Sequence, residues 1–422
     1  MEGIQNISSD ADKGRMMESS FKFKVVPPLS GLNRISFKFK TIKIALFLIL
    51  FSLFPFHFSH FTFPLSPFTL HASEWKQATG ERTWSFPADH GSHPEYRTEW
   101  WYFTGNLMDE AGSRYGYQLT FFRQGIENPT DGGSSLHKDN AWSVQDVYLA
   151  HFALTDVGKN RFWYIDRTSR TGPGLAHADT QGMDVHVLNW SARMNNKTII
   201  LNARHQGMEI KLELTPGKPV VLHGQKGMSI KGQKKGQSSY YYSFTDLKTS
   251  GSIKTPLNKE TVTVKGMSWF DHEFGSNQLA PEQVGWDWFS IRLSDGSDLM
   301  VYFLRRKDGS IETSSSGTLI EKNGSSRHLE LSDIKVDVLN RWKSPKSGGI
   351  YPGKWRMRIP SAHIDITITP SVANQELITE TSAGITYWEG AVEGKGVSKN
   401  RPVTVEGYVE LTGYTGSLGG IF

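Results

Sequence analysis

Three consecutive ionisable residues, Asp271-His272-Glu273, interrupt an aromatic segment that runs from Trp269 to Phe274. Charged groups in such surroundings are unfavourable unless they are exposed or used, which makes the segment a candidate site. Neighbouring Trp rings lower the local dielectric, so they raise the pKa of a carboxylic acid and make it a better proton donor. The ring faces also stabilise a carbocation. The combination suits proton-initiated chemistry on an alkene.

Carboxylates stand beside tryptophan at two more places. Glu99 begins the run Glu-Trp-Trp-Tyr, and Asp287 lies within Gly-Trp-Asp-Trp-Phe. Structural interpretations stay open for both, because Glu99 could form an ion pair with Arg97 and Asp287 could be a solvated outer residue. The candidate catalytic residues are Glu99, Asp271, His272, Glu273 and Asp287. The candidate ligand-binding residues are nearby aromatic side chains, namely Trp100, Trp101, Trp269, Trp286, Trp288, Tyr302 and Trp388.

The spacing of the three consecutive ionisable residues predicts which of them share a site. Successive side chains of a strand point to opposite faces, so Asp271 and Glu273 share one face and His272 takes the other. We expect the two carboxylates to line the site, with the pKa of one raised by its neighbour and by an adjacent Trp.

Metal and cofactor chemistry has little support in the sequence. The chain has no cysteine, which excludes disulfides, thiolate metal sites and a Cys nucleophile. His90 and His93 are spaced as His-x-x-His and could join Asp271 and His272 at a metal, but this spacing on a loop is a weak signal. No Gly-x-Ser-x-Gly, His-Glu-x-x-His or P-loop motif is present, which disfavours the common hydrolases, zincins and nucleotide-binding proteins. We predict neither a metal nor a cofactor.

The net charge of +5 is unevenly distributed along the 422 residues. Residues 1–72 carry eight Lys or Arg and four Asp or Glu, whereas the remaining residues carry 39 and 38, so the body is nearly neutral. A basic footprint for nucleic acid is therefore absent, and we predict no nucleic-acid partner.

The first 73 residues resemble an export signal or an anchor. Residues 1–43 form a polar tail that ends in a basic run, and residues 44–73 carry no formal charge. Ile44–Phe56 is an apolar core of 13 residues, the length of a signal-peptide core and short for a membrane span. We expect 44–73 to be a signal peptide or a retained anchor. The body would then be exported, periplasmic or membrane-anchored facing the periplasm, and would meet a membrane through this leader only.

The sequence of the body predicts β-strands, and the body contains an internal duplication. Four short matches recur in the same order in two halves of the body. They pair Val185–Trp190 with Val336–Trp342, Glu213–Pro216 with Thr367–Pro370, Val262–Gly266 with Val403–Gly407, and Trp100–Arg123 with Trp286–Arg305. We predict an all-β protein with two antiparallel β-barrels in tandem, 74–278 and 279–422, each able to hold an elongated apolar ligand in its mouth. A pair of β-sandwiches is the alternative.

The position of the duplication boundary predicts where a site would form. Asp271–Glu273 ends the first copy, and Gly285–Phe289 begins the second about a dozen residues later. Connections of that length join neighbours in space, so we expect the two copies to pack as one unit with both motifs near one cleft.

Longer motifs resemble a known family. Four segments carry the resemblance, namely Phe86–Gly105, Trp269–Glu273, Gly285–Phe289 and Gly407–Tyr414. They are similar to the AttH-type, carotenoid 1,2-hydratase-like proteins, relatives of hydroxyneurosporene synthase, over about residues 80–416. The resemblance implies two lipocalin-like barrels in tandem and an exported bacterial protein, sometimes encoded beside ABC-transporter components and often labelled a secreted hydrolase.

Two functions are compatible with these observations. In the first, the protein binds an elongated isoprenoid or acyl ligand and hydrates an alkene without a cofactor, as a carotenoid 1,2-hydratase-like lyase. An acid among Glu99, Asp271 and Asp287 would protonate the alkene, Trp100 or Trp286 would stabilise the cation, and His272 or Glu273 would deprotonate water. In the second, the protein is a non-catalytic lipid carrier or a partner of an ABC export system. A secreted hydrolase is less favoured, because no nucleophile is evident.

Overall fold

The computed structural model describes residues 75–128, 144–277 and 279–419, and these residues form an all-β fold. The tail and leader predicted for residues 1–73 lie outside this range. Three 3-10 helices punctuate the strands, η1 (Ala88–His90), η2 (Leu331–Asp333) and η3 (Pro360–Ala362). None of the helices in the described ranges has the length and apolar character needed to cross a membrane.

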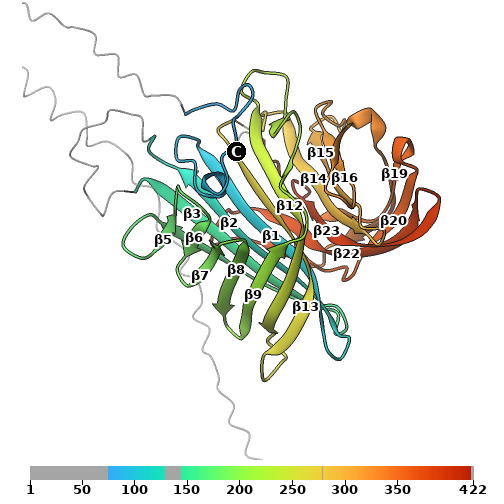
Figure 1. The fold of residues 1–422 in the computed structure, drawn as a ribbon, viewed down its shortest axis with the longest axis horizontal. Coiled ribbons are helices and arrows are strands. Elements are labelled where there is room, and N and C mark those ends of the chain that lie inside the picture. Colours follow the sequence, from blue (N-terminus) through green and yellow to red (C-terminus); the bar gives the residue numbers. More distant parts are fainter. Residues whose placement is uncertain (1–74, 129–143, 278, 420–422) are drawn as a thin grey trace, which may run out of the picture. The chain divides into compact units, whose positions relative to one another are not determined.

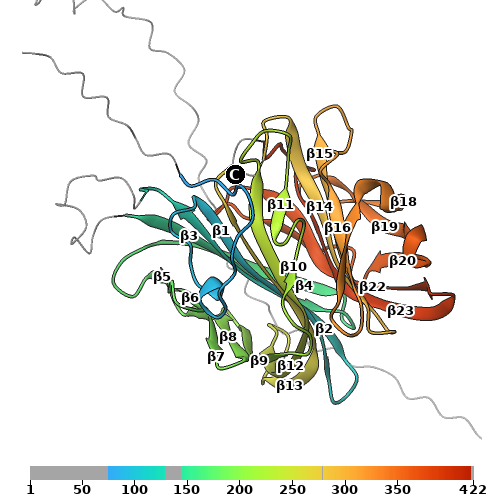
Figure 2. The same cartoon turned by 45° about the horizontal axis from the view of Figure 1, so that its top comes forward.

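The first half forms one antiparallel sheet of 13 strands that curls into a nearly closed barrel (Figure 1). Its strands are β1 (Thr98–Asp109), β2 (Arg114–Gly125), β3 (Asp146–Asp156), β4 (Arg161–Arg170), β5 (Ala176–Ala178), β6 (Asp184–Val187), β7 (Trp190–Asn195), β8 (Thr198–His205), β9 (Met208–Pro216), β10 (Val221–Leu222), β11 (Met228–Ile230), β12 (Ser238–Lys254) and β13 (Val262–Gly275). Along the main path the order is β4-β3-β2-β1-β13-β12-β9-β8-β7-β6-β5, and the short β10 and β11 pair with β12 (Figure 2).

The second half forms an antiparallel sheet of ten strands that curves into a half-barrel. Its strands are β14 (Gln283–Leu293), β15 (Asp298–Arg306), β16 (Ser316–Ile320), β17 (Ser326–Glu330), β18 (Lys335–Lys343), β19 (Ile350–Ile359), β20 (Ile364–Pro370), β21 (Glu376–Ile378), β22 (Thr386–Ser398) and β23 (Arg401–Leu411). Its order, β17-β16-β15-β14-β23-β22-β20-β19-β18, repeats that of the first nine strands along the path of the first sheet. The predicted tandem of lipocalin-like barrels is confirmed, and the shared strand order fits an internal duplication.

Alternating side chains fill the inside of each barrel. In β20 the isoleucines at 364, 366 and 368 are buried, while Asp365 and Thr367 face outward. In the first barrel large aromatic side chains, including Trp101, Phe103 and Trp190, are fully buried in the interior. The barrel interiors are therefore packed cores built by the barrel's own residues.

The two sheets pack against each other through their outer faces, and the described residues belong to one compact unit. Strand β1 contacts β23 and β2 contacts β22. Gly116 of β2 permits this approach, since a Cβ there would lie 2.7 Å from the hydroxyl of Tyr408 and 2.9 Å from Cβ of Ala391. A buried ion pair of 2.6 Å between Lys218 and Asp298 also joins the halves. The expectation that the two copies pack as one unit is confirmed.

Candidate active site

The principal cavity lies between the two sheets, and its volume is ≈ 160 Å³. One wall is the outer face of β1, β2, β3, β12 and β13, and the other is the outer face of β14, β15, β22 and β23. Its lining is mostly aromatic and aliphatic. Asp271 and Trp286 both line it, which confirms the expectation that the two motifs meet at one cleft. The site is thus between the barrels rather than in a barrel mouth, because the barrel interiors are filled.

The cavity places equivalent carboxyl groups from the two copies in one space. In the first sheet Asp271 is paired with Tyr102 of β1, and in the second Glu410 is paired with Trp288 of β14. Since β1 corresponds to β14 and β13 to β23, Asp271 and Glu410 occupy matching positions. Each accepts one indole N–H, from Trp269 at 2.8 Å and from Trp286 at 2.7 Å.

Burial raises the pKa of both carboxyl groups toward neutral pH. Desolvation raises the pKa of Asp271 to about 7, against the opposing effect of hydrogen bonds from Ser243 and Trp269. Burial likewise raises the pKa of Glu410 to about 7, with the Trp286 N–H acting in the opposite direction. Both groups therefore exchange a proton near neutral pH, as a general acid or base must.

A fixed charge pair lies beside Asp271. Lys231 forms an ion pair of 2.9 Å with Glu273, and its ammonium sits 4.2 Å from the ring centre of Tyr302. Although burial opposes its charge, the adjacent Glu273 raises the pKa of Lys231, which keeps it cationic. Ser239 also donates to Glu273 at 2.5 Å. The Glu273 carboxylate is thus held in one orientation at the cavity wall.

A second acidic residue, Glu389, lies next to Glu410. Glu389 is opposite Glu410 in the β22–β23 register and accepts a hydrogen bond from the hydroxyl of Tyr102. Burial and the charge of Glu410 raise the pKa of Glu389 well above its ordinary value, so Glu389 is neutral. A neutral acid beside Glu410 leaves a single negative charge to be shared by the pair.

The far end of the cavity holds a histidine and a tyrosine. His151 Nδ1 lies 2.7 Å from the hydroxyl of Tyr387, and His151 Nε2 lies 2.9 Å from Oγ of Ser382. Burial lowers the pKa of His151 to about 4, so the ring is neutral. This end therefore offers polar but uncharged contacts to a ligand.

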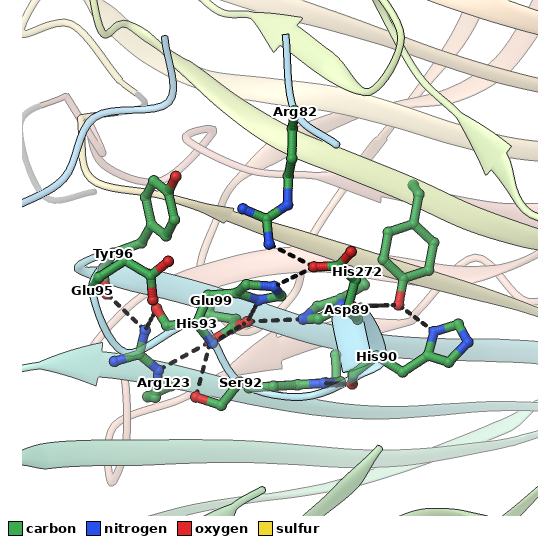
Figure 3. A network of polar contacts seen from close by, with 12 residues as sticks. Arg82, Asp89, His90, Ser92, His93, Glu95, Tyr96, Glu99, Arg123 and His272 are labelled. Atoms are coloured by element: carbon green, nitrogen blue, oxygen red, sulfur yellow. Dashed lines mark hydrogen bonds and ion pairs between the residues drawn. The ribbon is translucent and has the colours of Figure 1, made fainter. Parts of the chain in front are cut away.

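Glu99 and His272, two of the other predicted catalytic residues, belong to a separate buried network inside the first barrel (Figure 3). Glu99 accepts from His93 at 2.7 Å, from His272 at 3.0 Å and from Arg123 at 3.1 Å. Asp89 accepts from Arg82 at 2.5 Å and lies 3.1 Å from His93 Nε2. The network joins the segment before β1 to the barrel, and because none of its residues lines the cavity we assign it a structural role.

A metal ion fits this network poorly. His93, Glu99 and His272 do bring three ligand atoms within 4.8 Å of one another. However, both ring nitrogens already face the same Glu99 oxygen as hydrogen-bond donors. Burial disfavours the His93 cation, yet Glu99 and Asp89 raise the pKa of His93, so it carries a charge. The guanidinium of Arg123 adds a further positive charge beside Glu99, which opposes a bound cation.

The sequence-predicted residues therefore lie in several separate places. Those lining the cavity are Asp271, Glu273, Trp100, Trp286, Trp288 and Tyr302. Those inside the first barrel are Glu99, His272 and Trp101, and Glu99 pairs with Arg123 rather than with Arg97. Trp269 stands behind Asp271 and holds it through its N–H.

Two more predicted residues lie apart from the cavity. Asp287 forms an ion pair of 2.9 Å with Arg305 and accepts from Tyr414 at 3.0 Å, so it is neither a cavity residue nor freely solvated. Trp388 is buried in the core of the second barrel.

The sequence analysis did not select Glu410, Glu389 or Lys231 as site residues. The repeat itself held a signal for the first of these. Aligning Val262–Gly266 with Val403–Gly407 brings Glu410 within two residues of the position of Asp271. An acidic residue near the same place in both copies points to a shared site. Lys231 had no such signal, because it comes from the short β11–β12 connection.

The raised pKa of Asp271 predicts a pH-dependent stability. Its value rises from 3.8 to about 7 on folding, so its contribution is fully present below pH 3.8 and is lost as pH rises through about 7. Asp271→Asn removes this loss but keeps an acceptor for Ser243 and Trp269. We expect the stability of the variant relative to wild type to increase with pH over this interval, by on the order of a few kcal/mol.

Urea unfolding at several pH values checks this expectation. Parallel stability curves for the two proteins would show that Asp271 ionises at its ordinary pKa.

Comparisons with known proteins agree with this architecture. A model of the AttH-like family matches residues 77–414. An AttH protein from Nitrosomonas europaea has a similar structure, with 31% sequence identity and a TM-score of 0.70, over 80% of this chain and 99% of its own. Kievitone hydratase from Nectria haematococca is similar at 14% identity and a TM-score of 0.62, over 82% of this chain and 97% of its own, which shows a shared fold. A search of curated proteins finds no match.

Proposed function

The chain belongs to the AttH-like family, and from this premise we propose that it hydrates an alkene of an elongated apolar molecule bound between its two barrels, without a cofactor. One observation carries the proposal. Asp271 and Glu410, each with a pKa of about 7, face a single cavity with an aromatic lining. At neutral pH such a pair supplies an acid and a base together.

The acid step is assigned to Asp271. Its O–H proton passes to one alkene carbon, so a C–H bond forms, the π bond breaks, and a cation remains on the other carbon. The faces of Trp100 and Trp286 line the same cavity and stabilise that cation through their ring quadrupoles. Lys231 balances the charge of Glu273 beside Asp271 through their ion pair.

The base step is assigned to Glu410. Water forms a C–O bond with the cation, and the Glu410 carboxylate accepts the proton that the water releases. His272, which the sequence suggested for this role, lies on the opposite face of β13 and hydrogen-bonds Glu99. Glu273 shares the face of Asp271 and orients the water.

Occupation of the cavity tests the proposed ligand class. Ala383 lines the cavity at its loop edge, so Ala383→Trp should fill it, whereas Ala111→Trp places the same side chain on an exposed turn. We expect mass spectrometry of organic extracts to find an isoprenoid or acyl molecule with wild type and Ala111→Trp, and none with Ala383→Trp. Equal retention by both variants would place the ligand elsewhere. Retention by wild type with no turnover of any alkene would favour the carrier function.

Export remains part of the proposal. The neutral body and the apolar, uncharged run at 44–73 support a site of action outside the cytoplasm. Cell fractionation with an antibody to the body tests this. Recovery of the protein only from the cytoplasm would contradict it.

A further inference from the structure

A chain of hydrogen bonds leads away from Asp271 through residues that do not line the cavity. Ser243 of β12 donates to Oδ1 of Asp271. Oγ of Ser243 lies 2.6 Å from Nε2 of His223, and Nδ1 of His223 lies 2.9 Å from Oγ1 of Thr318 on β16. None of the three hydroxyl and imidazole residues lines the cavity, and all are buried.

We propose that Thr318, His223 and Ser243 form a proton relay that returns a proton to Asp271 after it has protonated a substrate. The inference rests on the proposed function, because a relay is needed only if Asp271 loses its proton into an occupied cavity. The bound apolar molecule would then cover Asp271 from the cavity side and leave the route through Ser243.

The directions of the hydrogen bonds support conduction. An ionised carboxylate can only accept, so Ser243 donates to Asp271 and its oxygen accepts from Nε2–H of His223. Nδ1 of His223 is then free of hydrogen and accepts from Thr318. Burial lowers the pKa of His223 to about 3, so the ring is neutral and has one donor and one acceptor.

The hydrogen-bonded chain ends at Thr318, and His328 lies beyond it toward the surface. His328 of β17 is directly opposite Thr318 in the β16–β17 register, so the two side chains share a face. Its side chain is 32% exposed, and its Nε2 lies 3.3 Å from Glu330 at the surface. Its Nδ1 is buried without a hydrogen-bond partner among the described residues, so this nitrogen is available to the Thr318 hydroxyl although no hydrogen bond joins them in the structure.

The transfer conserves protons. When Asp271 is left as a carboxylate, the Ser243 proton moves to it, the Nε2 proton of His223 moves to Ser243, and the Thr318 proton moves to Nδ1. Thr318 would regain a proton from His328 when the threonine hydroxyl turns from His223 toward the unpartnered Nδ1 of His328. The proton released by the added water leaves from Glu410, so each cycle takes up one proton and releases one.

The same residues suggest a competing role, which the geometry disfavours. Ser243 and His223 have the spacing of a nucleophile and its base. A nucleophile must reach the substrate, yet Ser243 is fully buried and does not line the cavity.

Exchange of the Asp271 carboxyl proton tests the relay without requiring a substrate. The infrared carbonyl band of protonated Asp271, identified by its loss in Asp271→Asn, shifts when the protein is mixed rapidly with heavy water. We would measure the rate of this shift in buffer saturated with n-dodecane as an apolar probe of the cavity. Exchange through the cavity occurs in all variants. Differences in exchange rate between variants therefore measure exchange through the relay.

Thr318→Val and Thr318→Ser are the matched variants. Valine keeps the shape of threonine and removes the hydroxyl, so we expect exchange to slow at least about tenfold, while serine keeps the wild-type rate. His223→Gln should slow exchange as Thr318→Val does. It provides the test of the relay if Thr318→Val does not fold. Equal rates in wild type, Thr318→Val and His223→Gln would overturn the relay. Covalent labelling of Ser243 by a fluorophosphonate would also overturn it.

The two proposals can fail separately. Slowed exchange in Thr318→Val with no hydration of any alkene would support the relay as a proton path and refute the hydratase function. Hydration at a wild-type rate in Thr318→Val, with unchanged exchange, would support the function and refute the relay.

Discussion

Asp271→Asn is expected to lower the rate of alkene hydration by about two to four orders of magnitude, because the amide cannot donate the proton that starts the reaction. The variant should still fold, since asparagine can accept from Ser243 and from the Trp269 N–H. The rate would be followed as alcohol formed from geranylgeraniol, which offers four isoprenoid alkenes.

Asp287→Asn is the matched control for this prediction. Asp287 is also a partly buried carboxylate between tryptophans, but it faces Arg305 and Tyr414 rather than the cavity. It should change the rate little and lower the stability, because Arg305 loses its partner. Equal loss of rate in both variants would mean that the tryptophan-flanked carboxylates act through stability and not through proton donation.

Glu99→Gln is expected to destabilise the fold by about 3–5 kcal/mol, because it leaves the charges of Arg123 and His93 buried and incompletely paired. Glu99 is fully buried, and His93, His272 and Arg123 all donate to it. Although burial favours the neutral acid, these neighbours hold the pKa of Glu99 well below its ordinary value. Urea unfolding near neutral pH measures the effect.

An exposed ion pair provides the control for Glu99. Glu393 pairs with Arg114, and both side chains are exposed by more than two fifths. Glu393→Gln should therefore change the stability by about 1 kcal/mol or less. A loss of similar size in the two variants would contradict the structural role assigned to the Glu99 network.

Periodicity in the sequence predicted the local structure of the site correctly. The alternation at Asp271-His272-Glu273 placed the two carboxylates on one face and the histidine on the other, as in the structure. The same period of two is seen in the buried isoleucines of β20. The repeat gave two copies of one sheet, and their strand orders agree.

Periodicity could not predict which face of each strand lines the cavity, because this depends on tertiary packing. A strand pattern shows that two faces differ, but it does not show which face meets a cavity. Trp101 and His272 fill the inside of the first barrel, so the ligand space formed outside it, where the second sheet covers Asp271. Glu99 was chosen for its Trp neighbours, yet its partners His93 and Arg123 come from six and 24 residues away in the sequence.

Glu410 was missed because its partners are distant too. Its significance depends on Trp286, which is 124 residues away and donates to it. The duplication offered an indirect route to it, through the matching position of Asp271.

The most direct test of the central claim is the isotopic composition of the product formed in heavy-oxygen heavy water. Wild type should convert geranylgeraniol to an alcohol whose new hydroxyl oxygen comes from solvent and whose neighbouring carbon carries one solvent deuteron. Asp271→Asn and Glu410→Gln should form almost none, and Asp287→Asn should form nearly as much as wild type. An alcohol without the carbon-bound deuteron, or equal yields from wild type and Asp271→Asn, would contradict acid–base hydration in the cavity between the barrels.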